Sequence, residues 1–180
     1  SVLIVKELVH SMGRGEVNGF ILKLEFEKAF DSVKWSFLFH VLASCGFGAR
    51  WISWMKAILQ TTRMSILVNG SLSSEFKVGR GLRQGDPLSP YLFILCAEGL
   101  SSLLKRYEEK NWIHGVKICR KAPTITHMLF ADDSYLFCRA DPEEAVRVND
   151  LLATYERASG QQVNKEKSSV FYSPNVLPYN

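Results

Sequence analysis

The stretch Phe130-Ala-Asp-Asp-Ser-Tyr-Leu-Phe137 decides the fold, because two adjacent aspartates, Asp132 and Asp133, interrupt an otherwise apolar run. Apolar residues on both sides of a short polar turn are typical of strands, so the pattern predicts a β-hairpin with both carboxylates at its tip. Two ionised side chains in adjacent positions repel each other unless a cation stabilises them. Mg²⁺ prefers a few carboxylates together with substrate phosphates. The hairpin is therefore a candidate magnesium site, although an Asp-Asp turn taken alone is more often a solvated loop.

A further carboxylate lies in the segment from Phe20 to Phe26, which is short, apolar-rich and strand-like. The alternation of a strand predicts that one face carries Ile21, Lys23 and Glu25 and that the other carries Phe20, Leu22, Leu24 and Phe26. A site that transfers phosphoryl groups with two metal ions needs a carboxylate from a second strand. Glu25, at the end of its strand, is placed to supply that carboxylate. In isolation, the same residue is an exposed charge at a strand end.

The segment from Gly79 to Gly85 is a glycine-rich basic loop, which contains Arg80, Arg83 and Gln84. Such side chains suit contact with phosphates or hydrogen bonding with a nucleotide, but the loop alone is weak support for either. Asp86-Pro87 follows directly, and this pair is expected to provide the cap and the first turn of a helix. The apolar positions expected along the buried side of that helix are Leu88, Tyr91, Leu92, Leu95 and Leu103.

Cap and turn residues predict most of the remaining elements. Asp31 is expected to cap a helix that ends near Cys45, because its side chain can accept the free N–H groups of a first turn. Short strands are expected over residues 64–68 and 75–78, linked through Asn69-Gly70 as a hairpin with a longer loop. Asp141-Pro142 starts a later helix that Gly160 ends. Further helices are expected over residues 2–12 and 51–60, and a last strand over residues 168–172.

Bulk properties fit one globular domain, since the chain has 180 residues and 47% hydrophobic content. The net charge of +4 is compatible with a polyanionic partner but is also common among ordinary proteins. The most apolar stretch, Leu88 to Leu104, is interrupted by a proline, a glutamate and a glycine, so we expect no membrane span. Neither a zinc site nor a disulfide scaffold is supported, and free thiols in a reducing compartment are expected, because wide spacing separates Cys45, Cys96, Cys119 and Cys138.

Taken together, these segments resemble reverse transcriptases, and in wording they are most similar to those of plant LINE-type (non-LTR) retrotransposons. Leu24-Glu-Phe-Glu-Lys-Ala-Phe-Asp-Ser-Val33 is similar to the first palm motif of the family. Gly81-Leu-Arg-Gln-Gly-Asp-Pro-Leu-Ser-Pro90 is similar to the second motif, and Phe130-Ala-Asp-Asp133 to the metal-binding hairpin. Ser159-Gly160 and Asn164-Lys-Glu-Lys-Ser168 are similar to the fourth motif. Four motifs in the family's order argue against chance similarity.

The resemblance implies an α+β polymerase palm, with a small, mainly antiparallel sheet backed by helices. It implies that residues 1–180 are a fragment of a reverse transcriptase domain, holding the palm and the end of the fingers but no thumb. The implied reaction is RNA-directed DNA polymerisation, in which two metal ions assist nucleotidyl transfer to a primer 3′ end. The implied cofactor is Mg²⁺, with Mn²⁺ as an alternative. The implied partners are an RNA template, a DNA primer and deoxynucleoside triphosphates, and no membrane.

The resemblance also assigns roles to individual residues. Asp132, Asp133 and Glu25 would bind metal at the catalytic centre, and Phe30 would exclude a 2′-hydroxyl. Lys167 is expected near the leaving pyrophosphate. The remaining positions expected to contact nucleotide or template are Ala29, Arg83, Gln84 and Gly85.

Glu25 departs from the family pattern, which has aspartate five positions before Phe30. Asp31 is a poor substitute, because it lies beyond the strand. A glutamate keeps the charge but moves the carboxylate outward, and a displacement of about 1 Å can cost on the order of 10²-fold in rate. Impaired polymerase activity is therefore expected, also because of the expected truncation. The alternatives are a catalytically inactive retrotransposon relic and a nucleic-acid-binding fragment that uses Arg80 and Arg83.

Overall fold

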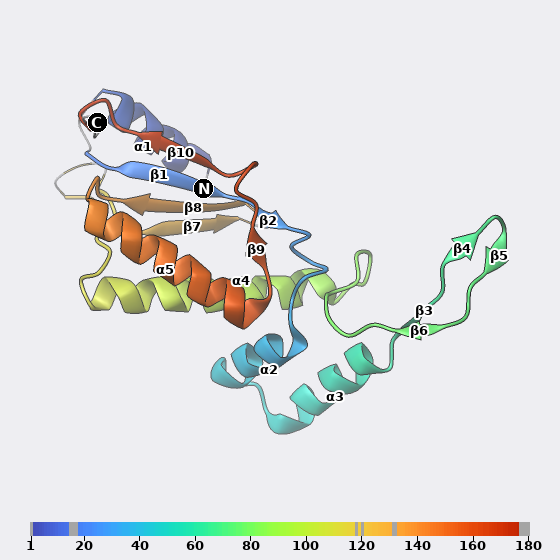
Figure 1. Cartoon of the computed structure of the whole chain (residues 1–180). Coiled ribbons are helices and arrows are strands. Elements are labelled where there is room, and N and C mark those ends of the chain that lie inside the picture. Colours follow the sequence, from blue (N-terminus) through green and yellow to red (C-terminus); the bar gives the residue numbers. More distant parts are fainter. Residues whose placement is uncertain (1, 15–17, 118, 120, 131–132, 177–180) are drawn as a thin grey trace.

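A four-stranded antiparallel sheet forms the centre of the molecule, in the order β10-β1-β8-β7 (Figure 1). The structure, a computed structural model, describes residues 2–14, 18–117, 119, 121–130 and 133–176. The hairpin predicted from the Asp-Asp stretch is confirmed by the pairing of β7 with β8, in which Phe130 lies opposite Asp133. The strands of this sheet are β1 (Phe20–Leu24), β7 (His127–Phe130), β8 (Asp133–Cys138) and β10 (Ser169–Tyr172).

Helices cover both faces of this sheet, as Figure 1 shows. Phe20 and Leu24 of β1 pack into a core shared with α4 (Ser89–Glu109) and α5 (Pro142–Ser159). Ile21, between them, packs on the other face against Leu8 and Met12 of α1 (Val2–Gly13). The predicted alternation is therefore confirmed, and Lys23 lies on the Ile21 side of the strand.

A second core joins α2 (Trp35–Ser44) and α3 (Ala49–Gln60) to the first half of α4. The buried members of this core are Val33, Leu38, Leu42, Met55, Leu82, Leu92, Phe93 and Cys96. Because α4 contributes to both cores, it holds the two parts of the molecule together. None of the helices in the described part of the chain is long and apolar enough to cross a bilayer.

A long hairpin arm reaches away from these cores between α3 and α4 (Figure 1). Asn69 and Gly70 both have positive φ angles, +50° and +83°, as expected of this dipeptide. The predicted hairpin is confirmed, but its loop is shorter than predicted, because Val68 pairs with Ser71. The apolar side chains of the arm are exposed, among them Ile66, Leu67 and Leu72. Its strands are β3 (Arg63–Met64), β4 (Leu67–Val68), β5 (Ser71–Leu72) and β6 (Phe76–Lys77).

Glu25 marks the point where the chain leaves the central sheet. Phe26, the last residue of the predicted strand, forms β2 (Phe26–Glu27) together with Glu27, and β2 pairs with β9 (Gln162–Val163) in a separate two-stranded sheet. The predicted strand is thus split in two, and Glu25 lies at the junction.

The predicted ends of α5 are confirmed. Asp141 caps the helix by accepting a hydrogen bond from the backbone N–H of Glu143 at 2.9 Å, and Pro142 occupies the first turn. Gly160 ends the helix with a φ of +82°.

The cap predicted at Asp31 is wrong. Helix α2 begins at Trp35, and its N-cap position is held by Lys34, which has no side-chain cap. The backbone N–H of Lys34 donates to the carbonyl of Ser159 at 2.7 Å. Asp31 lies in the turn before it, where its carbonyl packs closely against Gly81, so tertiary contacts rather than a local cap determine where α2 begins.

The predicted start of α4 is also wrong. Asp86 accepts a hydrogen bond from the backbone N–H of Leu88 at 2.9 Å, but this closes a turn before the helix, which begins at Ser89 with Pro90 in its first turn. The buried side of α4 also differs from the predicted one, because Tyr91 is 68% exposed and Leu88 is 38% exposed. The buried residues of α4 are Ser89, Leu92, Phe93, Cys96, Leu100, Ser101 and Leu104.

Gly81→Ala is expected to destabilise the fold by about 2 kcal/mol or more. Gly81 has a φ of +89°, which disfavours a side chain, and an added Cβ would lie 2.6 Å from the carbonyl oxygen of Asp31. Urea denaturation measures the loss. Gly79→Ala is the matched control, because an added Cβ there meets nothing within 4 Å, and its effect should stay within about 0.5 kcal/mol. Equal losses of unfolding free energy in the two variants would show that the close approach of Gly81 to Asp31 is not the cause.

Candidate active site

Two carboxylates predicted for the site come together at the end of the central sheet. Glu25 follows β1 directly, and Asp133 is the first residue of β8. These strands are antiparallel, and Leu24 pairs with Ser134. The next step of the register places Glu25 level with Asp133. Asp132, the other predicted metal ligand of the hairpin, lies outside the described residues.

Lys23 links the two carboxylates. Its Nζ lies 2.9 Å from Glu25 Oε1 and 3.2 Å from Asp133 Oδ1. Hydrogen bonds to Glu25 first and to Asp133 second raise the pKa of Lys23 above its ordinary value, so the ammonium stays charged. Sequence reasoning gave Lys23 no role, although the two-residue spacing in a strand already places it on the same side as Glu25.

The donor set of this site fits a hard divalent cation. Two carboxylate oxygens from different strands converge on one positively charged atom, and carboxylate oxygen is what Mg²⁺ prefers as a protein ligand. Among the described residues no group of three His, Cys, Asp or Glu side chains is arranged to hold a metal. The described residues thus supply two carboxylates from two strands.

The fourth motif fixes the backbone of Glu25. The backbone N–H of Glu25 donates to Ser168 Oγ at 3.1 Å, and its carbonyl accepts from the N–H of Asn164 at 2.7 Å. Lys167 is exposed, and its backbone N–H donates to Asn164 Oδ1 at 3.1 Å. The backbone of Glu25 is therefore fixed by the segment between β9 and β10. The pyrophosphate role of Lys167 remains a prediction.

Phe30 is held by packing and by the turn around it. Its ring stacks on that of Phe93 of α4, with centroids 4.3 Å apart and planes within 9°. The carbonyl of Ala29 accepts from Gln161 Nε2 at 3.0 Å, and the buried Gln161 in turn accepts from the hydroxyl of Tyr155 at 2.6 Å. Sequence reasoning missed Gln161, which lies next to Ser159-Gly160 in the fourth motif.

The second motif docks on the same turn through backbone hydrogen bonds. The N–H groups of Gly81 and Leu82 donate to the carbonyls of Val33 and Phe30, both at 2.8 Å. Trp35 Nε1 donates to the carbonyl of Gly81 at 2.8 Å. Three of the sequence motifs therefore share one turn of the first motif.

Gln84 and Gly85 lie at the exposed tip of this loop, where Gly85 has a φ of +86°. Gln84 lines a hollow of about 540 Å³ together with Asp31, Phe76 and Arg80. In the described part of the chain, no hydrogen bond or ion pair joins Gln84 to Glu25 or Asp133. Contact of Gln84 and Gly85 with a nucleotide or template remains a prediction.

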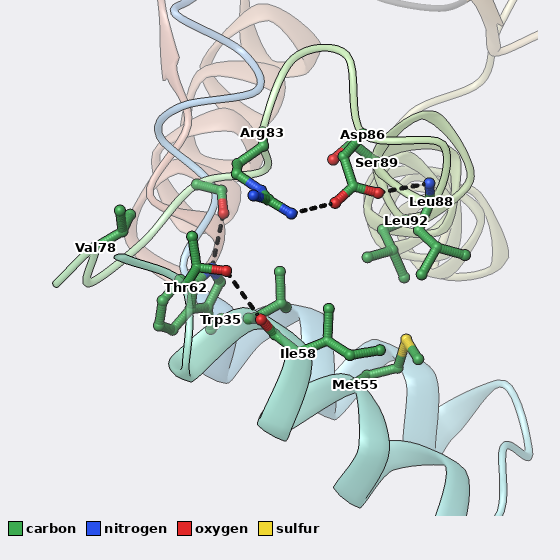
Figure 2. A pocket seen from close by; sticks show the side chains of 12 residues that line it. Trp35, Met55, Ile58, Thr62, Val78, Arg83, Asp86, Leu88, Ser89 and Leu92 are labelled. Atoms are coloured by element: carbon green, nitrogen blue, oxygen red, sulfur yellow. Dashed lines mark hydrogen bonds and ion pairs between the residues drawn. The ribbon is translucent and has the colours of Figure 1, made fainter. Parts of the chain in front are cut away.

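Arg83 forms an ion pair with Asp86, as Figure 2 shows. Arg83 Nη2 lies 2.8 Å from Asp86 Oδ2, above a small apolar hollow lined by Ile58 and Leu92. The backbone N–H of Leu88, and secondly the guanidinium of Arg83, hold the pKa of Asp86 below its ordinary value of 3.8. The ion pair stabilises the conformation of the loop. Arg83 would have to contact a nucleotide while it is paired with Asp86.

Residues 5–179 match the family described as reverse transcriptase (RNA-dependent DNA polymerase). The chain belongs to this reverse transcriptase family. The LINE-type, non-LTR resemblance is confirmed by relatives from retrotransposons. Over 169 residues the chain is 28% identical to the 149 kDa protein of transposon TX1 from Xenopus laevis, covering 94% of this chain and 12% of that protein. Over 152 residues it is 30% identical to the Pol polyprotein of type-1 retrotransposable element R2 from Popillia japonica. This match covers 82% of this chain and 20% of that protein.

A shorter match connects this reverse transcriptase chain to a plant protein. It is 50% identical over 68 residues to a mitochondrial protein of Arabidopsis thaliana, which covers 38% of this chain and 56% of that protein. The chain thus spans between 12% and 56% of the length of these relatives.

Solved structures show the same fold. Telomerase from Candida albicans, in complex with a fragment of telomeric RNA, superposes with a TM-score of 0.68 at 16% identity, covering 99% of this chain and 32% of that one. Apo telomerase from Candida tropicalis, truncated from its C-terminal domain, superposes with a TM-score of 0.67 at 15% identity. This match covers 97% of this chain and 36% of that one. The predicted α+β, palm-like fold is confirmed.

Lys23→Gln is expected to lower the melting temperature in the presence of a chelator, because Glu25 and Asp133 lose their shared cationic partner. Mn²⁺ should then raise the melting temperature of this variant more than that of the parent. Thermal unfolding with and without Mn²⁺ checks both statements. Lys117→Gln removes an exposed lysine elsewhere and should behave like the parent. An identical Mn²⁺ response in all three proteins would refute the role given to Lys23.

Asp86→Asn is expected to reduce the free energy of unfolding at pH 7 by about 0.5–1 kcal/mol, because the charge that pairs with the partly exposed Arg83 is lost. A lowered pKa stabilises the folded chain above the ordinary value and stops doing so as the pH falls through the folded value. The difference between parent and variant should therefore shrink between pH 5 and 3. Urea denaturation measures it, with the exposed Asp150→Asn as control. A difference that grows on acidification would show that the ion pair is not its source.

Proposed function

We propose that this chain is the RNA-directed DNA polymerase domain of a non-LTR retrotransposon-type protein, and that Glu25 weakens its activity. The observation that carries the proposal is the convergence of Glu25 and Asp133, from two strands, on the single ammonium of Lys23. Family membership supplies the reaction class, which is addition of deoxynucleotides to a primer 3′ end along an RNA template.

The proposed cofactor is Mg²⁺, with Mn²⁺ as an alternative. Glu25 and Asp133, together with Asp132, would hold the ions. When bound, two such ions stabilise the charge on the attacking 3′ oxygen and on the leaving pyrophosphate. Lys23 holds two of these carboxylates in place, since its ammonium balances their repulsion.

The other residues of the site bind and orient. We assign to Phe30 the exclusion of a 2′-hydroxyl, which requires a rigid ring, and its stack on Phe93 supports this. Gln84, Gly85 and Ala29 are assigned to the incoming nucleotide and the template, and Arg83 to a polar contact at the same loop. Lys167 is assigned to the pyrophosphate.

Glu25 is proposed to impair the reaction through geometry. Its backbone is fixed by Ser168 and Asn164, so the extra methylene of glutamate cannot be absorbed by moving the main chain. The carboxylate must reach farther from the sheet than that of an aspartate. Positioning errors of about 1 Å cost on the order of 10²-fold in rate.

The second candidate is a catalytically inactive relic, which the same glutamate favours, or a fragment that binds nucleic acid without chemistry. The two candidates differ in one respect: an impaired enzyme regains activity when the carboxylate is shortened, and a binding module does not.

Glu25→Asp is expected to raise primer extension by on the order of 10²-fold. The assay uses an RNA template, a DNA primer and Mg²⁺ or Mn²⁺. It is run on the chain alone and on the chain joined to the segments that flank the matching region in the R2 relative, because this chain spans only part of that protein. Strong extension is expected only in the joined protein with the substitution.

The matched control is Glu27→Asp, which shortens an exposed glutamate two residues away and should leave extension unchanged. Strong extension by the unsubstituted chain alone would show that Glu25 impairs nothing. Absence of extension in every form would favour the binding module.

A further inference from the structure

Strand β10 leaves one edge of the central sheet open. It lies at the end of the order β10-β1-β8-β7, and in the described part of the chain no strand pairs with its outer side (Figure 1). Natural proteins usually protect such edges with charged residues, proline or a bulge, because an open edge can add a strand. The strand itself, Ser169–Tyr172, contains no charged residue and no proline. The outer edge of β10 is therefore available for pairing.

The free backbone groups of this edge belong to Val170 and Tyr172. The backbone N–H of Ser173 donates to the carbonyl of Gly19 at 3.0 Å, so the backbone groups of Ser173 face β1. Backbone groups of successive residues in an antiparallel strand point to opposite sides. Those of Phe171 therefore also face β1, and those of Val170 and Tyr172 face away from the sheet.

Both ends of this free edge are limited. Ser168 has the same orientation as Val170, but its N–H already donates to the carbonyl of Asn164 at 2.9 Å. At the other end, Pro174 has no N–H to donate. The open edge thus offers two N–H groups and two carbonyls, all from Val170 and Tyr172.

We propose that β10 pairs antiparallel with β10 of a second copy of this chain, across a two-fold axis beside Phe171. In this register Val170 lies opposite Tyr172 of the second copy, so the free N–H and carbonyl groups of both residues are paired in both copies. Moving the axis to Val170 or to Tyr172 would bring Ser168 or Pro174 opposite a free residue, and neither has an N–H to give. The axis beside Phe171 is the register that satisfies the whole edge.

The charges of the edge suit a second copy of the same chain. A two-fold axis places each residue close to its own kind, so like charges near the axis would repel each other. Residues 168–176 include no charged residue, and Lys167 would lie opposite Asn175 of the second copy. Pairing covers the β10 edges of both copies, so the assembly closes at two.

Apolar side chains accompany the backbone pairing on both faces of the sheet. Phe171 pairs with Ile21 and therefore lies on the α1 side, where it is exposed. At the axis it would pack against Phe171 of the second copy. Val170 and Tyr172 are exposed on the α5 side, where they line an apolar hollow of about 320 Å³. The second copy would bring its own Tyr172 and Val170 beside this hollow, so pairing removes apolar surface from water on both faces.

Sedimentation velocity in reducing buffer tests this proposal, and the buffer keeps the exposed Cys45 and Cys119 from linking copies. The chain is expected to pass from monomer to dimer between about 1 and 100 µM, the range of a small interface. Phe171→Lys and Phe171→Glu are each expected to weaken dimerisation by about tenfold or more, because each places like charges opposite each other at the axis. An equimolar mixture of the two variants should dimerise again, because opposite charges then face each other.

The matched controls make the same changes at exposed apolar residues outside β10. Tyr91→Lys and Tyr91→Glu change a residue of α4, Leu67→Lys changes the hairpin arm, and all three should dimerise like the parent. A parent chain that stays monomeric over this range would overturn the proposal, as would a mixture of the two Phe171 variants that stays monomeric. Loss of the dimer in Leu67→Lys would show that the arm, not β10, joins the copies.

A second experiment keeps the hydrophobic edge and uses no charge. In a background with Cys45→Ser and Cys119→Ser, Phe171→Cys should form a disulfide between copies in oxidising buffer, because residues directly opposite in such a pair lie within disulfide range. Tyr91→Cys in the same background is the control and should stay unlinked. Equal linking of the two variants would overturn the two-fold register. Neither experiment involves catalysis, so both outcomes are independent of the proposed function.

Discussion

The turn between β2 and α2 is the constraint on which the site depends. Four of its backbone groups, from Ala29 to Lys34, find their hydrogen-bond partners in segments far along the chain. Backbone groups that leave regular structure inside a protein must be paired, and here the partners come from the second and fourth motifs. Loss of one partner would leave a backbone group without a hydrogen bond and would also remove a contact that holds the second or fourth motif against the turn. These hydrogen bonds thereby hold the first, second and fourth motifs, which are far apart in the sequence, together in space.

This arrangement explains why a glutamate can stand at position 25 without disturbing the fold. The main-chain contacts of Glu25 do not depend on its side chain, and its carboxylate lies at the edge of the sheet, partly exposed. Stability and the metal geometry proposed for this position are therefore separate requirements. A residue can satisfy the first while missing the second.

Local patterns in the sequence predicted the parts of the fold that local physics decides. The alternation of β1, the Asn69-Gly70 turn and both ends of α5 are confirmed because strand period, positive φ and capping are properties of a few neighbouring residues. The start of α2 was predicted wrongly at Asp31, since Lys34 is held by Ser159 from a distant segment.

Within the site, the meeting of Glu25 with Asp133 follows from the strand pairing that the motifs imply. The bridging ammonium of Lys23 could be suspected from spacing, but its contact with Asp133 depends on a register that no single segment contains. The hydrogen bond from Gln161 to the carbonyl of Ala29 joins residues 132 positions apart, so no local sequence pattern could predict it.

The hairpin arm has a consequence for how the protein behaves in solution. From Met64 to Ser74 it carries no charged residue, and β4 and β5 pair only with each other in the described structure. Unpaired strand edges beside exposed apolar side chains are templates for cross-β association between copies. The arm is thus the segment from which aggregation of the isolated chain would begin, and covering it would improve solubility without touching the candidate active site.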